Sequence, residues 1–170
     1  MWLRLLIIFL LFGFLGILQT SFLVQFNIMG TTANIVFILF FLIVFFEESQ
    51  QYIQGIFSAI VAGFFLDILS SSYFGGAIIS LLIIIFILKY LLSLLKKTRD
   101  KYPIIYFVPL FILSFIIFNL FLTIAIYFFN WSPIMPFSSW AFLVEIVYNL
   151  VFALLGFYIF KNSGFIFRKN

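Results

Sequence analysis

The chain has 170 residues, of which 66% are hydrophobic and only 8% are charged. A water-soluble domain of this length could not bury so much apolar surface, because a folded chain of this size still exposes much of itself. Cysteine and histidine are both absent, which excludes disulfides, thiolate nucleophiles, imidazole bases and most zinc sites. We therefore expect a membrane protein without cofactor or metal.

The apolar runs are continuous and approach the roughly 20 residues of a membrane-spanning helix, without the alternation typical of membrane barrels. We expect an all-α fold: one polytopic transmembrane domain over 1–170 with six helices, five being the alternative count. The 29 Phe are spread along every run, and we interpret them as lipid-facing bulk with a compositional bias. The expected spans are 5–26, 31–46, 53–70, 74–95, 104–129 and 140–160.

The first, second and fifth runs need separate comment. The first follows Arg4 and begins like a signal peptide, but no small-x-small cleavage site follows and the run continues past Gln19. We expect an uncleaved span. The second run is short and reaches spanning length only if residues 30–34 join it. In the fifth run, Pro109 is expected to kink the first turns.

The basic residues decide the orientation. With six spans and a cytoplasmic start, the outer loops contain no lysine or arginine, and all nine basic residues fall on the inner side. This distribution favours an even number of spans with both termini in the cytoplasm. Lys89, near the inner end of the fourth span, is expected to snorkel to the interface. A re-entrant hairpin of the third and fourth runs would also leave both termini on the same side, so this alternative stays open.

The cluster of basic residues at 96–101 could bind anionic lipid or a cytoplasmic partner, although topology alone explains it. The few basic residues at helix ends do not indicate nucleic-acid binding.

Two acids, Asp67 and Glu145, lie at membrane depth, where ionisable groups are costly. Small residues precede Asp67 at every fourth position, which places it on a helix-packing face. For Asp67 three roles are open: helix packing and capping, partner binding, or part of a substrate or proton pathway. For Glu145 the packing role is favoured. The candidate helix-packing or partner-binding residues are Gln19, Gly55, Ala59, Gly63, Asp67, Ser70, Gly75, Glu145 and Asn149.

The stretch Gly63-Phe-Phe-Leu-Asp67-Ile-Leu-Ser70-Ser-Ser-Tyr-Phe-Gly75 resembles the central motif of the MreD family of rod-shape-determining membrane proteins. That motif has a glycine, a short apolar stretch, an aspartate, two apolar residues, a serine and, after a short turn, a glycine. Here, as in the family, an apolar helix and a basic cluster follow it. Gln19 and its neighbours look like the polar break of the family's first helix. The proline that often precedes the position of Asn34 is absent.

The resemblance implies a non-enzymatic scaffold of the bacterial cell-elongation machinery in the cytoplasmic membrane. Its implied partners are an MreC-like membrane protein and, through it, an MreB-like filament and the peptidoglycan glycosyltransferase and transpeptidase. The helix layout of the family is similar to that of substrate-capture subunits of energy-coupling-factor transporters. A small-molecule capture subunit is therefore the alternative, with a polar pocket near Asp67, Asn119, Glu145 and Asn149. The sequence shows no nucleophile or metal-ligand cluster of the kind that would indicate an enzyme.

Overall fold

The computed structural model describes residues 2–28, 30–47, 52–69, 74–96, 101–130 and 139–163. These residues contain six α-helices, a short 3-10 helix and no strand, which confirms the expected all-α class. The helices are α1 (Trp2–Ser21), α2 (Ile35–Phe46), α3 (Ile53–Leu69), α4 (Gly76–Leu94), α6 (Pro103–Asn130) and α7 (Ser139–Ser163), and the 3-10 helix is η1 (Leu23–Phe26).

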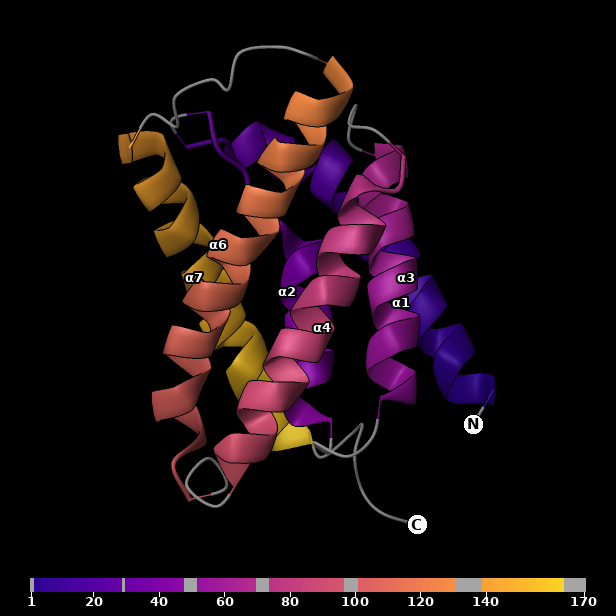
Figure 1. The fold of residues 1–170 in the computed structure, drawn as a ribbon, viewed down its shortest axis with the longest axis vertical. Coiled ribbons are helices and arrows are strands. Elements are labelled where there is room, and N and C mark those ends of the chain that lie inside the picture. Colours follow the sequence, from indigo (N-terminus) through magenta and orange to yellow (C-terminus); the bar gives the residue numbers. More distant parts are fainter. Residues whose placement is uncertain are drawn as a thin grey trace.

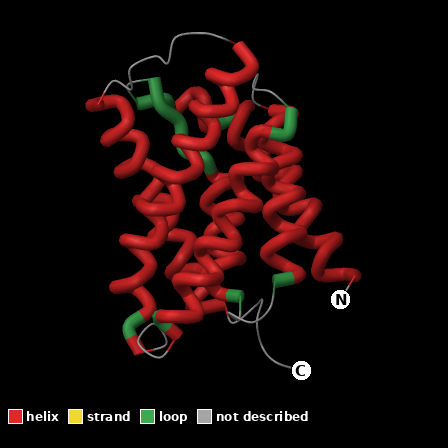
Figure 2. Tube along the Cα trace, in the orientation of Figure 1, coloured by secondary structure: helices red, strands yellow, loops and turns green. Residues whose placement is uncertain are grey.

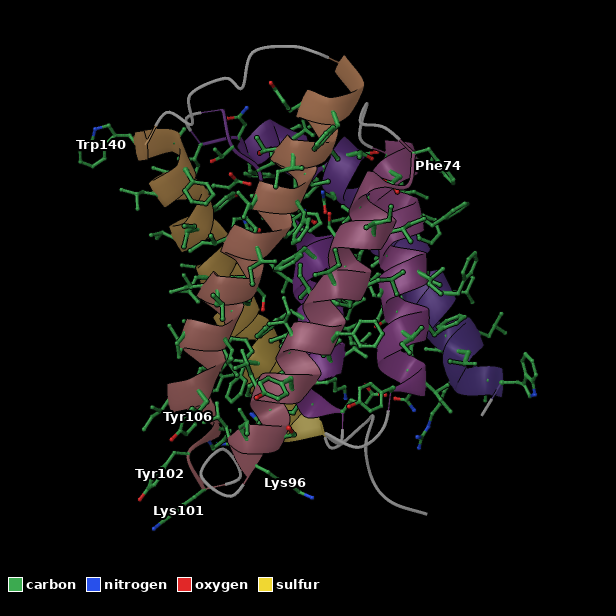
Figure 3. All side chains as sticks on the ribbon, viewed as in Figure 1. Phe74, Lys96, Lys101, Tyr102, Tyr106 and Trp140 are labelled. Carbon is green, nitrogen blue, oxygen red and sulfur yellow. The ribbon has the colours of Figure 1, made fainter. Side chains whose placement is uncertain are left out.

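Successive helices run in opposite directions, so that the start of α1 and the end of α7 lie at the same end of the bundle (Figure 1). We call this the lower end, and the opposite one the upper end. The described connecting segments gather at or near these two ends (Figure 2). Lys96 and Lys101 project from the lower end, whereas Phe74 and Trp140 lie at the upper end (Figure 3). The two labelled basic side chains therefore share one end.

The helices differ in length. Among the described residues, α1, α4, α6 and α7 are long and apolar enough to cross a membrane. The other two, α2 and α3, are apolar but have only 12 and 17 residues. At a rise of about 1.5 Å per residue, α2 extends over about 18 Å, less than the roughly 30 Å of a hydrocarbon core. The bundle thus surrounds a helix too short to span alone.

Local sequence explains where several helices begin. The Asn34 side chain accepts a hydrogen bond from the Phe37 amide at 3.0 Å and so starts α2 at Ile35, later than the expected residue 31. This is the usual role of an asparagine N-cap. Gly75 precedes α4 with a φ of 100°, which glycine adopts without strain. Pro103 begins α6, where its missing N–H costs nothing. Pro109 lies inside α6, and its kink stays a prediction.

The core is built around α2, whose residues from Val36 to Phe45 are all buried. A helix that is apolar on every side is a buried helix. Phe37 and Phe41 contact Phe111 of α6, with ring centroids 5.9 and 5.1 Å apart. In α7, Phe157 joins the same aromatic cluster. The interpretation of the phenylalanines as lipid-facing bulk is therefore wrong for these rings, although others, such as Phe128, are exposed.

Candidate functional site

The upper corner between α3 and α4 is organised by Asp67, which is only 4% exposed. Its Oδ2 accepts a hydrogen bond from the Gly75 amide at 2.8 Å, and its Oδ1 accepts one from the Ala77 amide at 2.9 Å. These amides belong to the start of α4, where unpaired N–H groups and the helix dipole favour a negative charge. Asp67 of α3 therefore caps α4 across the turn.

The small residues below Asp67 bring α3 and α4 together. A Cβ built on Gly63 would lie 2.5 Å from the Ile78 Cα and 2.7 Å from its nitrogen, so only glycine fits there. Ala59 is fully buried on the same side. Nearer the lower end, a Cβ on Gly55 would collide with Ile85 of α4. The small-residue face expected from the sequence thus packs against α4, and Asp67 faces protein. Ser70 lies outside the described residues.

A second polar cluster holds the start of α2. The Asn149 Oδ1 accepts a hydrogen bond from the Asn34 amide at 2.7 Å. The Gln19 Oε1 accepts one from the Val36 amide at 3.2 Å. With the cap made by Asn34 itself, three helices contribute to this terminus. Because lipid offers no partner to backbone groups, a helix that begins inside a membrane bundle needs such acceptors.

Two further polar residues of the sequence prediction do not join these clusters. The Asn119 side chain donates to the Phe115 carbonyl of its own helix at 3.0 Å. Glu145 is half-buried, and within the described ranges its carboxylate makes no hydrogen bond or ion pair, while its backbone carbonyl accepts from the Asn149 side chain at 2.8 Å. Asn119 therefore bonds within its own helix, and neither it nor the Glu145 carboxylate joins Asp67 in one polar site of the described residues.

A buried ion pair at the lower end was missed by the sequence analysis. The Lys89 Nζ lies 2.7 Å from the Glu47 Oε2, and both side chains are 0% exposed. The expected snorkelling of Lys89 is therefore wrong, because the side chain points into the bundle. One signal was available: Lys89 follows Ala77, Leu81 and Ile85 at helical spacing, and all of these are buried. A lysine on that face needs an acid at the same depth.

The chemistry of these clusters is structural. Asp67 and Glu47 bind backbone amides or a lysine, and no group of three metal-ligating side chains occurs in the part of the chain that the structure describes. Polar groups that are occupied in this way fix helix ends in place. Comparison with protein-family models, curated proteins and solved structures finds no match.

Proposed function

We propose that the chain is a non-enzymatic scaffold of a bacterial cell-elongation complex, of the MreD type. One observation supports this most. The residues that carry the resemblance, from Gly63 to Gly75, include the close approach of α3 to α4 and the Asp67 cap. The described part of the motif, residues 63–69 with 74 and 75, thus builds a fixed corner of the bundle, as a scaffold requires.

We further propose that this scaffold is a six-helix protein of the cytoplasmic membrane with its lower end in the cytoplasm. The exposed Lys96 and Lys101 at that end, and the exposed Trp140 at the other, support this orientation. Cationic side chains favour the cytoplasmic face, and tryptophan favours the interface. The shorter helices α2 and α3 would lie inside the membrane, packed among the four long helices.

Partner binding would use helix faces, because most of the described residues lie in helices. The outer face of α1 presents large apolar side chains, including Leu6, Leu10 and Phe14. Such a face can bind lipid or a partner helix. We propose an MreC-like protein as the direct partner, with an MreB-like filament and the peptidoglycan glycosyltransferase and transpeptidase reached through it.

Co-purification tests this proposal. Asp67→Ala should reduce the recovery of an MreC-like partner, because the α3–α4 corner loses its cap. Glu145→Gln is the matched control: it changes the other intramembrane acid, whose carboxylate has no partner among the described residues, and should leave recovery unchanged. Equal recovery with Asp67→Ala, at equal protein stability, would count against a role of the motif in assembly.

The alternative proposal is a small-molecule capture subunit, and Glu145 is the observation in its favour. A half-buried carboxylate without a described partner could bind a cationic or hydrogen-bonding ligand. A thermal-shift screen with vitamins and metal ions separates the two functions. Reproducible stabilisation by one compound, lost in Glu145→Gln, would favour capture. No stabilisation, together with loss of partner recovery in Asp67→Ala, would favour the scaffold.

A further inference from the structure

Three helices meet at the buried charges of the lower end. Glu47 directly follows α2, and its Oε1 accepts hydrogen bonds from the Gln54 and Gly55 amides at the start of α3, at 3.1 and 3.2 Å. Its Oε2 pairs with Lys89 of α4 at 2.7 Å. The Lys89 ammonium also lies 5.9 Å from the centre of the Tyr52 ring. One carboxylate therefore connects the end of α2, the start of α3 and the side of α4.

Neither charge would be stable at this place alone. Both side chains are completely shielded from solvent, and a buried charge without a partner is strongly unfavourable, whereas a pair with good geometry and further hydrogen bonds is tolerated. Here backbone amides donate hydrogen bonds to one carboxylate oxygen, and the ammonium lies 2.7 Å from the other as an ion pair. Burial of Glu47 therefore requires the charge of Lys89, and burial of Lys89 requires the charge of Glu47.

We propose that Glu47 and Lys89 form a lock that holds the end of α2 and the start of α3 against α4 and keeps the lower end of the bundle closed. Loss of either charge opens this end, because the remaining charge must reach water. The upper end stays closed, since Asp67, Gln19 and Asn149 hold it through separate contacts. The lock is a local conformational device and does not depend on the scaffold function.

Cysteine labelling can test the lock cleanly, because the natural chain contains no cysteine. Ser58 and Ser80 are matched probe positions. Each is buried, and each hydroxyl donates to a carbonyl of its own helix, at 2.8 Å to Gly55 and at 2.7 Å to Gly76. Ser58 lies one turn above the start of α3, near the lock, whereas Ser80 lies in the upper part of α4. Ser58→Cys therefore reports on the lower end and Ser80→Cys on the upper end.

The full-length protein in proteoliposomes is treated with a water-soluble maleimide. With Lys89→Met or Glu47→Gln, labelling at Ser58→Cys should accelerate at least about tenfold, because labelling through local opening follows the population of the open form. Labelling at Ser80→Cys should remain at the parental rate. The double variant Glu47→Gln/Lys89→Met buries no unpaired charge and should return to within about threefold of the parent.

The outcomes are separable. Unchanged labelling at Ser58→Cys in both single variants would overturn the lock, and so would an equal increase at both probes, which indicates general unfolding. If Ser58→Cys is labelled as fast in the double variant as in the single variants, mutual neutralisation of the two charges is not the basis of the lock. If the single variants fail to accumulate in the membrane, accumulation of the double variant supports the proposal, and failure of all three overturns it.

Discussion

Replacing Asp67 with alanine removes both acceptors from the start of α4 while leaving its backbone amides buried. The carboxylate makes two hydrogen bonds, at 2.8 and 2.9 Å, to Gly75 and Ala77. A hydrogen bond to a charged group contributes about 1.5–3 kcal/mol, so the loss of both should destabilise the protein by about 3 kcal/mol, the lower end of their sum. Asp67→Asn keeps one carbonyl oxygen and should lose about half of this amount.

Equilibrium unfolding in mixed detergent micelles measures these differences. The free energy of unfolding should fall in the order parent, Asp67→Asn, Asp67→Ala. For Asp67→Ala we expect about 3 kcal/mol, the lower end of the range. Hydrogen bonds between membrane helices often contribute less than the same bonds in isolation, because the unfolded chain also finds partners. If Asp67→Ala unfolds with the parental free energy, Asp67 does not cap α4 and the structural account of the motif is refuted.

Two other predictions concern close packing and the start of α2. Gly63→Ala places a methyl group 2.5 Å from the Ile78 Cα and should cost about 1–3 kcal/mol of unfolding free energy. Gly76→Ala, whose Cβ would make ordinary van der Waals contacts with Ala125 at 3.7 Å and Leu122 at 3.9 Å, should be tolerated, and equal stability of the two variants would contradict the close approach. Gln19→Leu and Asn149→Leu each leave an amide of α2 or its cap without an acceptor and should cost about 1–2 kcal/mol. Thr20→Val, which loses only hydroxyl bonds to its own helix, is their control in the same unfolding assay, and a larger loss there than in Gln19→Leu would count against the cap.

The helical class was predictable because it depends on composition. Long apolar runs with few charges leave no alternative to helices in lipid, and the observed α6, Pro103–Asn130, differs little from the expected 104–129. The small-residue face of α3 was predictable too, because spacing along a helix determines which side chains share a face. The spacing therefore predicts that Asp67 faces protein, although it does not identify Gly75 and Ala77 as its partners.

The tertiary partners were not predictable. Glu47 and Lys89 are far apart in sequence. The helical spacing of Lys89 indicates a buried face, but only the structure identifies Glu47 as the acid that pairs with it. The same holds for Gln19 and Asn149, which meet the start of α2 from opposite ends of the chain. Phenylalanine poses a similar problem, since the same residue suits lipid and core, and its position around α2 decides which one it contacts.

Labelling from one side of the membrane tests the central claim, a bundle whose helices alternate in direction with its basic end in the cytoplasm, most directly. Single cysteines at Lys96 and Lys101 report on the lower end, and cysteines at Phe74 and Trp140 report on the upper end; all four positions are exposed (Figure 3). In intact cells, an impermeant maleimide should label the two upper positions and reach the two lower ones only after lysis. Labelling of Lys96→Cys and Trp140→Cys from the same side would contradict the proposed topology.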